Sequence, residues 1–206
     1  MSAGLILAST SRWRAELLAR LELDFESLAP DFDERAHDGR FAELGPRDFA
    51  LLLARGKAES LVAKLGARAA WVLAADQIAV LDEGAGPVLL HKPGSAAKAV
   101  AQLMRLRGRS HSLVTAVVLA RVAGGRVVGE PTWAIDEQRL TMRSFAEAEA
   151  ADYVARHRPV DSVGAYHIED AGIRLFERIE GEDYTGIIGL PLLAVCRLLR
   201  AQGLLP

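Results

Sequence analysis

Cysteine is nearly absent from the sequence, in which Cys196 is the single cysteine among 206 residues. One cysteine cannot form an internal disulfide, and the five histidines do not fall at metal-binding spacings such as HExxH. Disulfide-stabilised secreted domains and zinc fingers are therefore excluded, and we expect a protein of the reducing cytoplasm. Each histidine is expected to lie at the surface or to form a structural hydrogen bond.

Long hydrophobic runs and an excess of one charge are also missing. The longest interior apolar run covers 113–120, far below the roughly 20 residues that cross a bilayer. The amino terminus lacks the basic region of a signal peptide. With 25 basic and 27 acidic residues the net charge is −2, which supplies no broad positive field for nucleic acid. The composition therefore predicts no membrane segment and no nucleic-acid polymer as partner.

Three common catalytic motifs are absent as well. There is no GxxxxGK[ST] loop and no GxGxxG after a predicted strand, and GRSHS at 108–112 lacks the last glycine of a GxSxG nucleophile elbow. The sequence thus favours neither a P-loop protein, nor a Rossmann fold, nor an α/β-hydrolase.

Short apolar runs typical of strands alternate along the chain with segments in which apolar residues have helical spacing, and this alternation predicts an α/β fold. We expect strands at 5–8, 71–75, 112–122, 126–128 and 132–143, and a strand pair or ribbon at 164–179. We expect helices at 12–21, 46–64, 95–106, 145–156 and 191–202, and a loop at 30–45. No repeat or linker divides the chain, so residues 1–206 are expected to form one domain.

Several polar residues follow predicted apolar elements. Ser9, Ser11 and Arg14 stand where a strand passes into a helix, and free backbone N–H groups, hydroxyls and a guanidinium there could hold an anion. A helix cap followed by a solvated arginine is the alternative. Lys57 shares a helix face with apolar residues, either as a functional ammonium or as a snorkelling side chain.

Asp76 stands at the end of an apolar run, a common position for a metal ligand or a general base. An Asx turn at Asp76 and an exposed turn at Lys92-Pro93 are the structural alternatives. Each residue alone leaves both interpretations open.

Taken together, these segments resemble the Maf family of nucleotide pyrophosphatases in order and spacing. The segments are LILASTSRWRAELL at 5–18, DFDE at 31–34, KAESL at 57–61, AADQ at 74–77, HKP at 91–93, GRSHSLVTAV at 108–117 and GIIGLPL at 186–192. The resemblance implies an elongated mixed-sheet fold of the Maf/ITPase-like kind with a cleft between two lobes. It also implies hydrolysis of nucleoside triphosphates to the monophosphate and pyrophosphate with a divalent metal, Mg²⁺ or Mn²⁺, and a possible homodimer.

Trp13, Gln77 and Glu169 resemble the branch of the family that acts on 7-methyl-GTP. Methylation at N7 makes guanine cationic, which suits stacking on the Trp13 indole, and the Glu169 carboxylate can accept from the Watson–Crick edge. A dTTP or UTP pyrophosphatase of the same family is the first alternative. A non-catalytic nucleotide-binding regulator of septum formation is the second.

The resemblance assigns the remaining roles. Asp76 is the expected proton acceptor, and whether it takes the proton directly or holds the metal stays open. The expected metal ligands are Glu34 and Asp76, and the expected phosphate ligands are Ser9, Ser11, Arg14, Lys57 and Lys92. The chain departs from the family pattern at Arg12, where proline is usual, at Ala75, at Gly186 and near Ser162.

Overall fold

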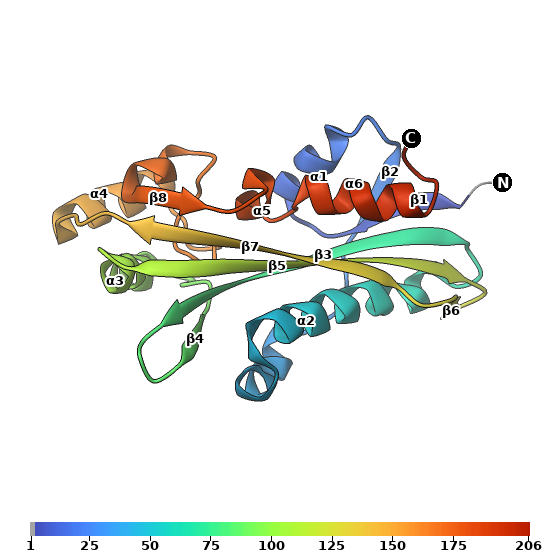
Figure 1. Ribbon diagram of the computed structural model, residues 1–206, viewed down its shortest axis with the longest axis horizontal. Coiled ribbons are helices and arrows are strands. Elements are labelled where there is room, and N and C mark those ends of the chain that lie inside the picture. Colours follow the sequence, from blue (N-terminus) through green and yellow to red (C-terminus); the bar gives the residue numbers. More distant parts are fainter. Residues whose placement is uncertain (1–2) are drawn as a thin grey trace.

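A single mixed sheet runs the length of the molecule. The computed structural model describes residues 3–206 and shows an eight-stranded sheet with the order β2-β1-β3-β5-β7-β8, in which β4 pairs with β3 and β6 with β5 (Figure 1). The strands are β1 (Gly4–Ala8), β2 (Phe25–Leu28), β3 (Ala70–Asp82), β4 (Pro87–Leu90), β5 (Ser110–Ala123), β6 (Arg126–Val127), β7 (Thr132–Met142) and β8 (Phe176–Glu180). β1 is parallel to β2 and to β3, whereas the other pairs are antiparallel.

Alternation along the central strands buries both faces of one end of the sheet. On β3, Val72 and Ala74 face α2 (Phe41–Leu65), while Leu73 and Ala75 face α1 (Arg12–Ala19) and α6 (Leu192–Ala201). Figure 1 shows α2 below the sheet and α1 and α6 above it. Because successive strand residues point to opposite faces, neighbouring residues of β3 contact different helices.

The other end of the sheet carries a second helical layer. There α3 (Ala96–Leu106) and α4 (Glu147–His157) pack with the ends of β3, β5, β7 and β8 in a separate apolar cluster. The molecule therefore has two lobes, an α2 lobe and an α3–α4 lobe, which share β3, β5 and β7 (Figure 1).

One edge of β3 opens between these lobes. β5 pairs with β3 along nearly its whole length, but on the opposite side β1 pairs only with 70–73 and β4 only with 79–82. Among the described residues, no strand pairs with 74–78 on that side. This interruption leaves space for side chains and loops at the middle of the sheet, and Asp76 lies in it.

Most predicted elements are confirmed, with boundaries shifted by at most two residues except on β3 and at the start of α2. The prediction that Asp76 ends a strand is wrong, because β3 continues to Asp82. Asp76 stays within the strand because it pairs in register with Ala116 of β5.

The predicted ribbon at 164–179 is largely wrong. Only β8 is a strand there, preceded by turns and a short 3-10 helix at Ala171–Leu175. Ala165 has a φ of 58°, which ends an extended conformation. Gly164 packs against the Tyr166 ring so closely that a Cβ would overlap it. The segment therefore folds back on itself.

The predicted loop at 30–45 contains a 3-10 helix at Glu34–Arg40 and the first turn of α2. Gly45, with a φ of 72°, interrupts α2 just before Pro46, so the long part of the helix begins where the sequence predicted. Two strands, β2 and β4, and the short helix α5 (Tyr184–Ile188) were not predicted from the sequence. Each has only four or five residues, too few for a distinctive periodicity.

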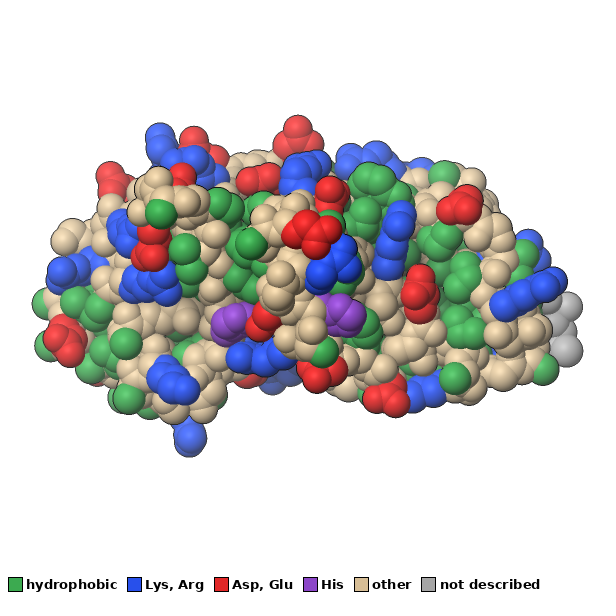
Figure 2. All heavy atoms as spheres, turned by 90° about the horizontal axis from the view of Figure 1, so that it is seen from below, with side chains coloured by type: hydrophobic (Ala, Val, Ile, Leu, Met, Phe, Trp, Pro, Cys, Tyr) green, Lys and Arg blue, Asp and Glu red, His purple; other side chains and the backbone are tan. Residues whose placement is uncertain are grey.

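Charge is mixed over the face of the molecule on the α2 side (Figure 2). Figure 2, a view from the α2 side, shows basic and acidic side chains interspersed, with no continuous basic stripe among the described residues on that face. Within the described chain, no helix combines the length and apolarity needed to span a membrane.

Candidate active site

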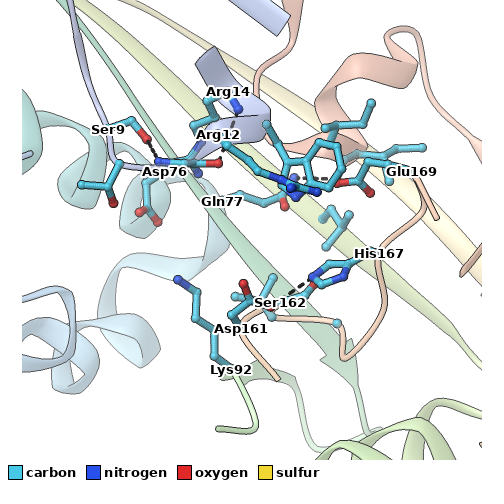
Figure 3. A pocket seen from close by; sticks show the side chains of 18 of the residues that line it. Ser9, Arg12, Arg14, Asp76, Gln77, Lys92, Asp161, Ser162, His167 and Glu169 are labelled. Carbon is cyan, nitrogen blue, oxygen red and sulfur yellow. Dashed lines mark hydrogen bonds and ion pairs between the residues drawn. The ribbon is translucent and has the colours of Figure 1, made fainter. Parts of the chain in front are cut away.

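A cavity of about 520 Å³ opens at the interrupted edge of β3, a volume typical of small-molecule sites. All ten residues proposed from the sequence line it, namely Ser9, Ser11, Trp13, Arg14, Glu34, Lys57, Asp76, Gln77, Lys92 and Glu169. In Figure 3, Arg12, Arg14 and Glu169 lie along one wall, with Lys92, Asp161 and Ser162 across from them. The fold thus brings residues from most of the chain into one pocket.

Three charged groups meet at the floor of the pocket. The Lys57 ammonium donates to the Asp76 carboxylate and lies 2.6 Å from Oε1 of Glu34. Asp76 is 3% exposed and Lys57 6% exposed. A buried charge is costly without a partner, so Lys57 and the two carboxylates depend on one another.

Alternation on β3 explains the meeting of Asp76 and Lys57. Asp76 follows Val72 and Ala74 on the face toward α2, and Lys57 lies on the side of α2 that packs against the sheet. An otherwise apolar interface therefore contains one ammonium and one carboxylate, opposite each other.

Glu34 reaches this pair because the preceding segment is bound to α2. The Asp31 N–H donates to Ser60 Oγ at 3.1 Å, and Lys64 Nζ donates to the Ala29 carbonyl at 2.7 Å. The Phe32 ring packs directly against Gly56, where any side chain would overlap it. Gly56 thus allows the close approach that places Glu34 beside Lys57.

The pKa values of the two carboxyl groups shift in opposite directions, because burial dominates at Asp76 and pairing with Lys57 dominates at Glu34. Burial raises the pKa of Asp76, with the Glu34 charge acting in the same direction and the Lys57 charge opposing it. Burial would also raise the pKa of Glu34, but its pairing with Lys57 outweighs this and lowers the pKa. Asp76 is therefore the stronger base of the pair, which suits a proton acceptor.

The turn from β1 into α1 supplies donors at one side of the pocket. Ser9 Oγ accepts from the Ser11 N–H at 3.1 Å, and Ser11 caps α1 by accepting from the Arg14 N–H at 3.4 Å. Arg14 Nε donates to the Gly189 carbonyl at 2.9 Å. Burial lowers the pKa of Arg14, yet an arginine stays charged. Its Nε is committed to the backbone, so its Nη atoms are the donors that a ligand can use.

Gln77 lies on the opposite face of β3 from Asp76. Its Nε2 donates to the Gly186 carbonyl of α5 at 2.6 Å and to Thr115 Oγ1 at 3.0 Å. Its amide N–H groups are thus occupied with holding α5. If Gln77 contributes to specificity, it therefore does so through Oε1, which can accept a hydrogen bond from a ligand.

Lys92 comes from the α3–α4 lobe. It is exposed and follows β4, and the nearby Gly94 N–H donates to the Val160 carbonyl at 2.9 Å. That hydrogen bond joins the Lys92 segment to the 158–170 segment. Lys92 therefore faces Lys57 and Arg14 from the other lobe.

Glu169 lies at the end of the pocket away from Asp76 (Figure 3), and Trp13 lines the same pocket. Both side chains are half-buried. Burial raises the pKa of Glu169, with the Asp170 charge among the factors that add to it. A positively charged ligand next to Glu169 would favour its ionised form.

A buried pair of side chains behind the pocket was not predicted from the sequence. His111 Nε2 and Tyr166 Oη are 2.7 Å apart, and Tyr166 lines the cavity. Burial lowers the pKa of His111 to about 4, so it is neutral at neutral pH. The expectation that a histidine forms a structural hydrogen bond is confirmed for His111. Its partner Tyr166 is 55 residues away in the sequence, so no local sequence pattern indicates the pair.

The two carboxylates fit one hard cation. Lys57 is itself a positive charge held between Glu34 and Asp76, and Mg²⁺ takes one or two carboxylates together with substrate phosphate oxygens. Within residues 3–206, no group of three or more His, Cys, Asp or Glu side chains is placed to hold a metal. A metal here would need the substrate to complete its ligands.

This arrangement suits a polyphosphate. Arg14, Lys57 and Lys92 converge on a pocket that also contains the backbone turn before α1 and a buried carboxylate of raised proton affinity. Such a site can bind several phosphate charges and accept a proton from an attacking water.

Comparison with known proteins agrees with this chemistry. Residues 4–202 match the model of the family described as Maf-like protein. The chain belongs to the Maf family. The resemblance inferred from seven sequence segments is therefore confirmed over almost the whole length.

Maf relatives align with nearly the whole chain. A protein from Chromohalobacter salexigens named 7-methyl-GTP pyrophosphatase is 39% identical over 98% of this chain and 97% of its own. One from Bradyrhizobium diazoefficiens named nucleoside triphosphate pyrophosphatase is 42% identical over 98% of this chain and 95% of its own. A solved structure, the Staphylococcus aureus Ham1 protein, aligns with 84% of this chain and 93% of its own at 14% identity and a TM-score of 0.43.

Proposed function

We propose that this protein hydrolyses nucleoside triphosphates, 7-methyl-GTP in particular, to the nucleoside monophosphate and pyrophosphate. The observation that carries the proposal is the buried Asp76, held by Lys57 in a pocket that Arg14 and Lys92 also line. The names of the relatives from Chromohalobacter salexigens and Bradyrhizobium diazoefficiens support the same reaction.

In the proposed reaction, a water oxygen forms a bond to the α-phosphorus while the bond from that phosphorus to the bridging oxygen breaks. Asp76 accepts the proton of the water, and pyrophosphate leaves. Its raised pKa makes Asp76 a better base than an ordinary aspartate.

The basic residues offset the charge that moves onto the leaving group. Lys57 and Arg14 approach the phosphates from the α2 lobe and Lys92 from the other lobe. Ser9 and Ser11, with the backbone N–H groups of the turn that they form, bind further phosphate oxygens. Positive groups fixed before the substrate arrives stabilise the transition state without rearranging.

Glu34 and Asp76 are the residues that would hold a divalent cation, Mg²⁺ or Mn²⁺. When bound, such a cation neutralises phosphate charge and makes a coordinated water more acidic. Lys57 contacts the same two carboxylates and so holds them close together in the pocket.

Trp13 and Glu169 are proposed to select the base. A cationic N7-methylguanine gains roughly 0.5–2 kcal/mol by stacking on an indole. The Glu169 carboxylate accepts from N1–H and the exocyclic amine and offsets the positive charge of the base. Gln77 supplies Oε1 as a further acceptor from the opposite face of β3.

A substrate panel tests the proposal. The protein is incubated with 7-methyl-GTP, GTP, dTTP and UTP, with Mg²⁺ or Mn²⁺, and the products are separated as pyrophosphate or orthophosphate. We expect pyrophosphate from 7-methyl-GTP at the highest kcat/KM. A preference for dTTP or UTP would replace the substrate assignment, and binding without turnover would support a regulatory role instead.

A further inference from the structure

Arg12 places a positive charge on the proposed base platform. Its guanidinium carbon lies 4.1 Å from the centroid of the Trp13 ring, within the distance of a cation–π contact. Both residues line the pocket. The indole that is proposed to attract a cationic base therefore already has a cation against one face.

Helix stability does not account for this arginine. Arg12 is the first residue of α1, and the first turn of α1 contains no acidic residue. A positive charge at a helix N-terminus is unfavourable because the helix dipole places partial positive charge there. Among the described residues, no carboxylate forms an ion pair with Arg12. Its contact is with the Trp13 ring.

We propose that Arg12 is a specificity-determining residue that reduces the preference of this protein for a cationic base over a neutral one. The inference rests on the proposed function and deepens it. Arg12 stays on one face of the Trp13 indole while the base stacks on the other face. The guanidinium then repels N7-methylguanine, whereas a neutral guanine is little affected.

Comparing two substrates isolates this effect. GTP and 7-methyl-GTP share the triphosphate, so any attraction between Arg12 and phosphate oxygens cancels in the ratio of their kcat/KM values. Two unit charges about 7–8 Å apart, screened about as strongly as in bulk water at the exposed rim of the pocket, repel each other enough to change a ratio by about threefold. Neutralising Arg12 should therefore raise the ratio of 7-methyl-GTP to GTP by about threefold.

The test measures kcat/KM for both substrates in the wild type, Arg12→Gln and Arg12→Lys. Glutamine removes the charge and keeps a polar planar group, while lysine keeps the charge. Arg20→Gln is the matched control, because Arg20 is exposed at the other end of α1 and is not among the residues lining the pocket. We expect the ratio to rise about threefold in Arg12→Gln and to stay near the wild-type value in Arg12→Lys and Arg20→Gln.

Other outcomes would overturn the inference. An unchanged ratio in Arg12→Gln would mean that the guanidinium leaves the ring or contacts only phosphate. An equal rise in Arg12→Gln and Arg12→Lys would assign the effect to the space occupied rather than to charge. If the wild type hydrolyses neither substrate, the proposed function itself fails, which is a separate result.

Discussion

The two ends of the pocket are built differently. At the phosphate end, Asp76 and Lys57 are almost fully buried on β3 and α2, and Glu34 completes the ion pairs. At the base end, Trp13 and Glu169 are only half-buried, and the Arg12 guanidinium lies over the face of the Trp13 ring. The groups proposed to perform the reaction are fixed by the sheet and a long helix, while the groups proposed to select the base are less buried.

This difference predicts which substitutions change the rate and which change the choice of substrate. In the proposed function, a residue at the phosphate end contacts what all triphosphates share, and a residue at the base end contacts what distinguishes them. Substitutions at the first end should change kcat/KM for 7-methyl-GTP and GTP equally, and substitutions at the second should change their ratio.

Asp76→Asn gives the largest expected loss of activity. Replacing a positioned base should lower kcat roughly 10²-fold or more for both substrates. Because the base must be ionised and burial raises the pKa of Asp76, wild-type activity should fall on acidification at a higher pH than an ordinary aspartate would give. Steady-state kinetics across pH checks both points. Asp152→Asn on α4 is the control, and full activity in a folded Asp76→Asn protein would remove the catalytic role.

Lys57→Met should cost stability as well as activity. Removing one partner of a buried ion pair destabilises by about 3–5 kcal/mol. In this variant the lost ammonium no longer opposes the burial that raises the Asp76 pKa, so the folded state binds that proton more tightly than the unfolded state does. The deficit relative to wild type is therefore largest at neutral pH and shrinks as the pH falls toward the usual aspartate range.

Chemical denaturation at several pH values measures this deficit. Lys98→Met on α3 is the matched control, because Lys98 is exposed and its replacement should change stability by less than about 0.5 kcal/mol. An equal deficit at all pH values would contradict the role of Asp76 ionisation.

Lys92→Ala tests whether the α3–α4 lobe contributes to phosphate binding. Loss of an exposed phosphate-binding ammonium should lower kcat/KM by roughly tenfold, since a charge-assisted hydrogen bond contributes about 1.5–3 kcal/mol before solvent screening. The fall should be equal for 7-methyl-GTP and GTP, and it should shrink at high salt. A change in their ratio would place Lys92 at the base instead.

Trp13→Ala and Glu169→Gln should have smaller and more selective effects than the substitutions at the phosphate end. Loss of stacking on the indole should lower the ratio of 7-methyl-GTP to GTP about fivefold, equivalent to about 1 kcal/mol. Glu169→Gln should lower the ratio in the same direction because it removes the negative charge. If both variants reduce the two substrates by the same factor, the base end does not discriminate as described.

Local signals in the sequence predicted much of the framework. Ser11 caps α1, Gly66 follows the end of α2 and Gly124-Gly125 turns β5 into β6, all features that depend on near neighbours. The strand pair or ribbon predicted at 164–179 was largely wrong because Ala165 adopts a left-handed conformation, which the sequence does not reveal.

The geometry of the site was harder to predict, because it depends on contacts between residues that are distant in sequence. Asp76 and Lys57 were identified separately from the sequence, and only the family resemblance connected them. Their pairing follows from the position of Asp76 on the α2 face of β3, which required the strand to continue beyond 75. The commitment of the Gln77 amide to Gly186, 109 residues away, and the stacking of Arg12 on Trp13 have no counterpart in any local pattern.

The position of bond cleavage is the most direct test of the account. Hydrolysis of 7-methyl-GTP in water enriched in ¹⁸O, followed by mass spectrometry of the products, shows which phosphorus the water attacks. Attack at the α-phosphorus, guided by Asp76, predicts one ¹⁸O atom in 7-methyl-GMP and none in pyrophosphate. Label in pyrophosphate, or release of labelled orthophosphate with a diphosphate product, would contradict it.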